Sequence, residues 1–222
     1  MFADRLIKNL ASKDPSVENP SAWFATKDGV EKNKIDFLEI LTKPFQGRRC
    51  QFFDFGEIPR SCVDDEYSAA LPAWCEGFLK LPAPVCFFTW SSASPDEDFV
   101  SGHTEGLLLV ETYYTDHEAL GVAIQRFEAR PNTSEITRSG DAELLYGQKG
   151  NSSVLVPASP SYQPSMSLLI KAAMPLFVML GRLNAEGIEK SVIFPPEKLN
   201  RRRKKRNQPE LIVHTTVRVA PY

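Results

Sequence analysis

The segment GLLLVETYYTDHEALGVAIQRF, residues 106–127, carries the clearest structural pattern in this chain of 222 residues. Its two ends are apolar runs, and the polar residues 115–118 separate them. In residues 119–127 large apolar side chains alternate with small or polar ones, the period of two that is typical of a strand. The segment therefore predicts a β-hairpin, with the second face of residues 119–127 exposed or thinly covered.

Further strands are predicted on both sides of this hairpin. CFFTW (86–90) is typical of a buried strand, and it follows LPAP (81–84), where each proline disfavours helix at the preceding residue. Residues 143–146 and 152–158 are expected to pair across a turn that contains glycine. LIVHTTVRV (211–219) is expected to form the last strand, with leucine and valine on one face and mainly polar residues on the other.

The strongest helical pattern lies in residues 164–184, PSMSLLIKAAMPLFVMLGRLN. Pro175 has no amide hydrogen and is expected to kink this helix, which we expect to pack against the sheet. Shorter helices are predicted near residues 1–12 and 35–41. The sequence thus predicts an α+β fold, with a mainly antiparallel sheet packed on a central kinked apolar helix.

The composition, 42% apolar and 24% charged, is that of a globular protein. We divide the chain into an N-terminal helical or irregular segment, residues 1–45, and a single α+β domain, residues 46–222. The longest apolar stretch, residues 168–180, is shorter than the ~20 residues that span a bilayer, so no membrane partner is expected.

The cysteines are Cys50, Cys62, Cys75 and Cys86. Their spacing matches no zinc site and the N-terminus has no signal-peptide pattern, so reduced thiols and a cytoplasmic location are predicted.

Positive charge is concentrated near the C-terminus, although the whole chain has a formal net charge of −2. Residues 197–206 contain seven cations and one anion, a net charge of +6, which leaves −8 on the other 212 residues. Prolines at positions 195, 196 and 209 flank this segment, so we expect a solvated basic loop over residues 197–210. A chain of phosphates is the obvious ligand for such a cluster.

We predict that this loop binds nucleic acid, because each cation that contacts a phosphate releases bound counterions. The predicted contacts are Arg201, Arg202, Arg203, Lys204, Lys205 and Arg206. His214 and Arg218, on the polar face of the final strand, are expected to extend the site. No known base-reading motif accompanies these residues, so contact with the backbone or shape is favoured. Contact with an acidic protein surface, solvation and a localisation signal are the alternatives for the basic run.

The C-terminal part of the chain also carries a resemblance. In PPEKLNRRRKKRNQPELIVHTTVRV (195–219) a basic run leads through a proline into a final strand, and LPAPVCFFTW (81–90) contains an upstream strand. In these features the chain resembles a loosely defined group of phage and prophage proteins of unknown function. Where that group has Gly-Lys-Pro, this chain has Arg206-Asn207-Gln208-Pro209. The resemblance implies a phage-related origin, with the host cytoplasm as location, and it supplies no catalytic residue.

Signals for catalysis are few. A metal-dependent nuclease is the enzyme class most compatible with a basic patch, but no Asp or Glu after Pro95-Asp96 is followed two positions later by Lys. The acidic clusters at 64–66 and 96–98 are typical of exposed loops or helix starts. The histidines at 103, 117 and 214 are expected to be structural. No nucleotide-binding, metalloprotease or hydrolase motif occurs, so no catalytic residue, metal or cofactor is predicted.

Three functional hypotheses follow. The first is a non-enzymatic, phage-related binding protein that contacts nucleic acid or a nucleoprotein through the basic loop. The second is a protein–protein interaction module, a host-factor inhibitor or a self-associating component, that uses the acidic body. The third is a metal-dependent nuclease.

Aromatic pairs such as Tyr113-Tyr114 place one ring on each face of a strand. An exposed ring is therefore a candidate for stacking on a base, although core packing is the expected role.

Overall fold

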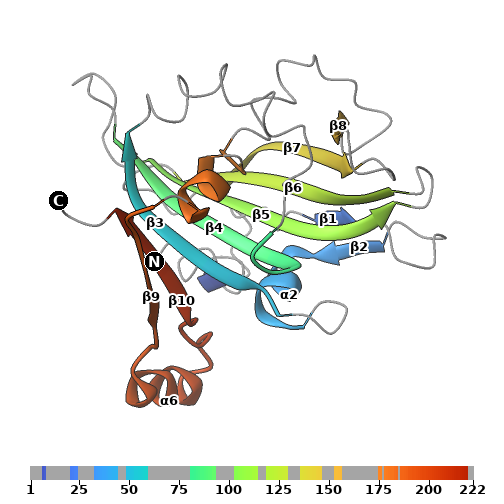
Figure 1. Ribbon diagram of the computed structural model, residues 1–222. Coiled ribbons are helices and arrows are strands. Elements are labelled where there is room, and N and C mark those ends of the chain that lie inside the picture. Colours follow the sequence, from blue (N-terminus) through green and yellow to red (C-terminus); the bar gives the residue numbers. More distant parts are fainter. Residues whose placement is uncertain are drawn as a thin grey trace.

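An eight-stranded mixed sheet forms the centre of the computed structural model (Figure 1). The structure describes residues 7–8, 21–24, 33–44, 49–59, 81–93, 103–114, 119–129, 136–146, 153–156, 175–176, 178–184 and 186–219. The sheet contains β3 (Gln51–Pro59), β4 (Val85–Ala93), β5 (His103–Tyr114), β6 (Ala119–Ala129), β7 (Ile136–Tyr146), β8 (Ser153–Val156), β9 (Ile188–Ile193) and β10 (His214–Val219). Its strand order is β8-β7-β6-β5-β4-β3-β10-β9. Outside this sheet, β1 (Ser21–Phe24) pairs with β2 (Asn33–Asp36), and α2 (Phe37–Thr42) follows β2.

Most neighbouring strands are antiparallel, and the predicted hairpin is confirmed. β5 and β6 pair from Thr104↔Ala129 to Tyr114↔Ala119. β7 pairs with β8, which is the second strand pair that the sequence predicts. β3 differs, because it is parallel to both of its neighbours, β4 and β10. The architecture is therefore a mixed sheet with a few short helices, mainly β in content.

The central strands are buried on both faces. On one face, Phe88 of β4 packs in a cluster with Met179 of the short helix 178–184. On the other face, Phe87 packs in a second cluster with Ile40 of α2. Strands that are covered on both faces appear as continuous apolar runs in the sequence, as CFF in β4 and LLLV in β5 do. The sheet thus lies between the helix 178–184 and N-terminal residues.

The second face of β6 is buried, so the prediction that it is exposed or thinly covered is wrong. Val122 and Ile124 belong to the cluster with the helix, whereas Ala123 and Phe127 belong to the cluster on the opposite face. Gln125 is also buried. The covering side chains come from distant parts of the chain, and the alternation within β6 carries no information about them.

The long central helix that the sequence predicts is not found among the described residues. Residues 175–176 and 178–184 are helical, and their apolar side chains pack on the sheet as expected. Residues 164–174 lie outside the described residues, so a kink at Pro175 stays a prediction, as does a domain boundary at residue 45. No helix in the described part of the chain has the length and apolar character needed to span a bilayer.

A bulge in β3 depends on Gly56. The register between β3 and β4 shifts between Asp54 and Glu57, where β3 holds one residue more than β4. Gly56 has a φ of 67° there, a left-handed conformation that costs other residues about 1–2 kcal/mol. Its amide donates to Asp54 Oδ1 at 3.0 Å. The extra residue allows both Phe55 and Ile58 to lie in the same cluster, on the face of the helix 178–184.

Gly56→Ala is expected to lower the free energy of unfolding by about 1–2 kcal/mol, because alanine is strained at this φ. The added Cβ would also lie 2.6 Å from Arg218 Nη1, so the guanidinium must move. Gly187→Ala is the matched control, since Gly187 has a φ of 72° and no atom within 4 Å of an added Cβ. Urea titrations should show a larger loss for Gly56→Ala; equal losses would contradict a contribution from the Arg218 contact.

Candidate functional site

The C-terminal elements form a projection at one edge of the sheet (Figure 1). β9 is the edge strand and pairs antiparallel with β10, and α6 (Glu197–Lys205) connects the two. β10 joins the rest of the sheet through Thr215 and Thr216, which pair with β3. We refer to residues 188–219 as the finger. In Figure 1 its tip, α6, lies beyond the end of the sheet.

The basic segment is largely helical, so the prediction of a loop over 197–210 is wrong for residues 197–205. The carbonyl of Pro196 accepts the first helical hydrogen bonds, from the amides of Leu199 and Asn200. Glu, Lys, Leu and Arg are strong helix formers. Glu197 and the basic last turn both complement the helix dipole. Together these terms offset the mutual repulsion of the cations, which by itself favours a solvated loop.

A Schellman motif closes the C-terminal end of α6. Asn207 has a φ of 51°, in the left-handed region. Its amide donates to Lys204 O at 3.1 Å, and the amide of Gln208 donates to Arg203 O at 3.0 Å. This pair of bonds defines the motif and satisfies carbonyls that a helix end otherwise leaves open. The last cation of the run, Arg206, is the C-cap residue.

Two side chains attach α6 to the segment that leads into β10. Asn200 Nδ2 donates to Leu211 O at 3.0 Å, and Asn200 Oδ1 accepts from Leu211 N at 2.7 Å. Arg203 Nε donates to Pro209 O at 2.7 Å. No residue of α6 is buried. Polar contacts rather than a core therefore set the position of this helix.

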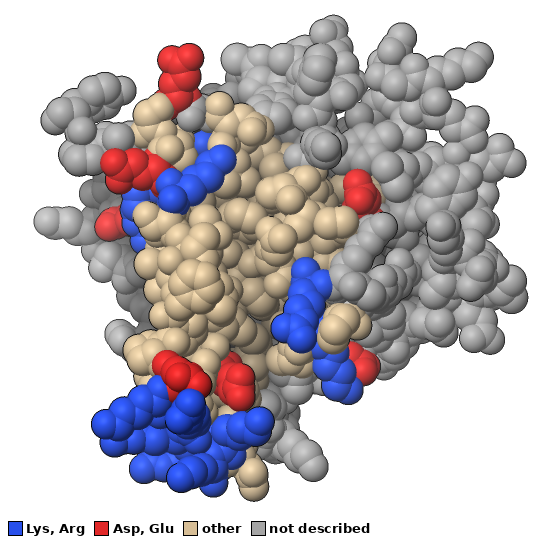
Figure 2. Space-filling model, turned by 60° about the horizontal axis from the view of Figure 1, so that its bottom comes forward, with Lys and Arg blue, Asp and Glu red and all other residues tan. Residues whose placement is uncertain are grey.

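These attachments determine which cations face away from the protein. An α-helix turns about 100° per residue, so Asn200 and Arg203 lie on one side of α6. The opposite side, which we term the outward face, carries Lys198, Arg201, Arg202 and Lys205. All four side chains are exposed. Figure 2 shows the largest cluster of Lys and Arg side chains at the bottom of the view, and smaller groups elsewhere on the same face.

Few of the six predicted cations are neutralised by the protein itself. Arg201 forms an exposed ion pair with Glu197, of a kind that contributes little in water. Arg203 donates to a backbone carbonyl and so has a positional role. Within the residues that the structure describes, the remaining four form no ion pair: Arg202, Lys204, Lys205 and Arg206. Their charge is therefore open to an external anion.

The other two predicted contacts lie on β10 rather than on α6. His214 begins the strand, and its Nδ1 lies 3.5 Å from Ile212 O. Arg218 is four residues further on, about 13 Å along a strand that rises 3.3 Å per residue. Arg218 Nη1 donates to Asp54 O at 3.0 Å, and Nη2 lies 3.7 Å from Asp54 Oδ2. The structure thus brings the six cations together and places Arg218 at the bulge of β3.

Two exposed residues, one within α6 and one just before it, were not among the predicted contacts. Lys198 lies on the outward face. It shares that face with Arg202 and Lys205 only because residues 197–205 form a helix. Phe194 follows β9 directly, and 73% of its surface is exposed. The sequence carries little signal for Phe194, a phenylalanine that is followed by two prolines.

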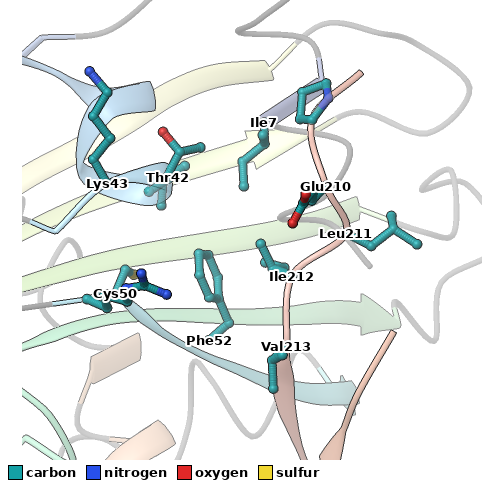
Figure 3. Close-up of a pocket in the computed structure, with 12 residues that line it drawn as sticks. Ile7, Thr42, Lys43, Cys50, Phe52, Glu210, Leu211, Ile212 and Val213 are labelled. Atoms are coloured by element: carbon teal, nitrogen blue, oxygen red, sulfur yellow. The ribbon is translucent and has the colours of Figure 1, made fainter. Parts of the chain in front are cut away.

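A pocket of about 630 Å³ lies beside the base of the finger (Figure 3). Phe52 and Ile212 contribute apolar walls, and the exposed Lys43 and Arg49 contribute positive charge. Lys43 forms an exposed ion pair with Glu39. The segment 209–213, which supports α6, also lines this pocket.

The described residues offer no metal site. Among them, no group of three or more His, Cys, Asp or Glu side chains is placed to hold a metal ion. The acidic clusters at 64–66 and 96–98 lie outside the described residues, and so does His117.

The two described cysteines, Cys50 at the pocket and Cys86 in the core, are free thiols, as predicted. Desolvation by burial, with a smaller contribution from Cys86, raises the pKa of Cys50 well above its ordinary value. Burial raises the pKa of Cys86 from 9.0 to about 12. Because the thiolate is the reactive form, neither thiol is suited to act as a nucleophile at neutral pH.

Comparison of the chain with known protein families, with curated proteins and with solved structures finds no match. The resemblance to phage and prophage proteins therefore stays a prediction. Function has to be argued from the geometry and charge of the finger.

Asn207→Gly is expected to stabilise α6 by about 0.5–1 kcal/mol, because glycine adopts a positive φ without strain. Asn207→Ala is expected to destabilise the helix by a similar amount. The measurement is amide hydrogen exchange of residues 201–208, which should slow in the glycine variant and accelerate in the alanine variant. Identical exchange in both variants would contradict the role assigned to this helix end.

The high pKa of Cys86 predicts a loss of stability in alkali. Above pH 9.0 the thiol ionises in the unfolded chain, whereas in the folded protein it keeps its proton up to about pH 12. The folded state then binds more protons, so the free energy of unfolding falls as pH rises, by up to about 1.4 kcal/mol per pH unit. Urea titrations under reducing conditions at pH 8 to 10.5 should show a shallower fall for Cys86→Ala. Equal slopes for the two proteins would contradict the assignment.

Proposed function

We propose that this protein is a non-enzymatic nucleic-acid-binding protein and that α6 contacts the phosphate backbone. The observation that carries the proposal is the outward face, whose exposed cations are Lys198, Arg201, Arg202 and Lys205. These cations repel one another on a helix that contributes no residue to a core. A chain of phosphates replaces this repulsion with attraction and gains further free energy from the release of counterions.

The helix dipole accounts for only part of this charge. Cations in the last turn of a helix interact favourably with its C-terminus, by about 0.3–1 kcal/mol each. Arg202 through Lys205 benefit in this way. Lys198 lies in the first turn, where the dipole disfavours a cation, and yet it extends the same outward face. An external anion accounts for a cation at this end of the outward face, which the helix dipole does not.

The supporting contacts leave α6 without a free amide side chain to read adenine. Amide side chains recognise adenine in the major groove through paired hydrogen bonds. Asn200 is the only amide side chain within α6, and both of its ends are occupied by Leu211. All the other polar side chains of α6 except Glu197 are cations, and cations bind phosphates of any sequence.

The proposal has a biological setting in the resemblance of the C-terminal segment to phage and prophage proteins. We include a phage-related origin in the proposal, with action in the host cytoplasm. The partner is then nucleic acid, free or within a nucleoprotein.

Arg202→Gln/Lys205→Gln is expected to weaken binding to a 20-nucleotide single strand and to reduce its salt dependence. Each phosphate contact contributes about −0.7 to the slope of log K against log salt, so the slope should become less steep by about 1.4. Fluorescence anisotropy between about 50 and 200 mM salt measures both quantities.

The matched control is Lys8→Gln/Lys43→Gln, which removes the same charge from exposed positions outside the finger. It is expected to bind like the unmodified protein. Circular dichroism checks that the glutamine variants keep their helix content. An unchanged affinity and slope for Arg202→Gln/Lys205→Gln would reject α6 as the binding element.

A further inference from the structure

An exposed aromatic ring stands beside the basic helix. Phe194 connects the end of β9 to Pro195 and Pro196, and 73% of its surface is exposed. Burying a phenylalanine side chain is worth about 1.5–3 kcal/mol, so a ring held in water forgoes a large stabilisation. In a chain that buries most of its described phenylalanines, this exception marks a candidate contact residue.

Phe194 belongs to a short apolar strip on one face of the finger. The register of β9 and β10 pairs Ile193 with His214, and its continuation places Phe194 opposite Val213. Val192 lies two residues before Phe194 and so on the same face. Val192 is 54% exposed and Val213 is 47% exposed. Isolated apolar side chains on a surface are ordinary, but three neighbouring ones at the end of a projection indicate a contact surface.

The two prolines restrict the backbone that carries the ring. A proline disfavours helical backbone at the residue before it, so Phe194 is kept extended and does not join α6. Pro196 then accepts the first hydrogen bonds of the helix. The ring is thereby placed before the first turn of α6, which carries Lys198. Little conformational freedom of the backbone remains to be lost when a ligand binds.

We infer that Phe194 stacks on an unpaired base while the outward face of α6 holds the adjacent phosphates, which makes the ligand a single-stranded nucleic acid. This inference rests on the function proposed for α6. Aromatic rings next to a basic surface are the usual means of binding single strands without sequence preference, because every base has a flat apolar face. In a duplex the bases are already stacked on each other and are not available to a ring at a protein surface.

The cations of α6, which begins three residues after Phe194, favour this ligand over an uncharged apolar partner. From Lys198 to Lys205 the outward face extends about 10 Å along the helix, at 1.5 Å per residue. A single strand offers both bases and phosphates within that distance. An apolar protein surface would match the strip but would leave the outward face without a counter-charge.

Three substitutions at Phe194 test the inference: Phe194→Ala, Phe194→Leu and Phe194→Trp. Binding is measured by anisotropy with the single strands dT20 and U20 and with a 20-base-pair duplex. Because one stacked base contributes about a 5- to 150-fold change in affinity, Phe194→Ala should weaken single-strand binding by a factor in that range. Duplex binding should change little. Phe194→Trp should bind like the unmodified protein, and its additional fluorescence should be quenched by dT20.

Phe194→Leu separates stacking from simple apolar contact. Leucine keeps most of the apolar surface but has no flat ring, so this variant should bind dT20 as weakly as Phe194→Ala. If Phe194→Leu binds like the unmodified protein, the stacking inference is overturned. It is also overturned if all three variants bind normally while Arg202→Gln/Lys205→Gln does not, and in that case the function proposed for α6 stands.

Two further outcomes identify other failures. If the unmodified protein binds neither single strands nor duplex, the proposed function itself fails. Vesicles containing an anionic lipid are the remaining probe, since exposed aromatic and basic residues also bind membrane surfaces. Vesicle binding that Phe194→Ala abolishes, with nucleic-acid binding unchanged, would overturn the inference in favour of a lipid ligand.

Discussion

Both faces of the central strands have to be covered, and the remaining structure depends on this requirement. Residues 85–88 and 107–110 are apolar at every position and almost completely buried. Each large apolar side chain buried in this way stabilises the fold by about 1.5–3 kcal/mol. One face is covered by the helix 178–184 and the other by N-terminal residues such as Ile7 and Ile40. With both faces covered, the C-terminal elements are added at the edge of the sheet, beyond β3.

The finger at that edge is stabilised in a different way. Its outer strand, β9, is exposed from its second residue onward, and α6 has no buried residue. Strand pairing, the contacts of Arg218 with Asp54 and the two hydrogen bonds of Asn200 hold it in place. Segments with few buried apolar contacts have lower local stability than a core. A ligand that binds the folded finger would therefore also stabilise it. Charge can accumulate here because every cation keeps its contact with water.

The sequence predicts the structure best where neighbouring residues determine the outcome. The hairpin of β5 and β6 was predictable because its alternation and its turn lie within 22 consecutive residues. The cluster of six cations was predictable because a run of charged residues is visible in the sequence without knowledge of the fold. The prediction of a loop over residues 197–205 fails because repulsion between like charges is offset by helix propensity, by the helix dipole and by the Schellman motif at the C-terminal end. Lys198 and Phe194 were missed because their relation to the other cations depends on that helix and on the register of β9 with β10.

The sequence by itself determined the two strand pairs β5–β6 and β7–β8, the burial of residues 86–90 and the place of the positive charge. These properties follow from local periodicity and from the hydration of apolar and charged groups, which act on each segment separately. Only the tertiary structure decided that β3 is parallel to both neighbours, that β6 is covered on both faces and that Arg218 fastens β10 instead of extending the basic site. Each of these outcomes depends on contacts between residues far apart in the chain, such as Arg218 with Asp54, whose free energy is gained only when the sheet assembles.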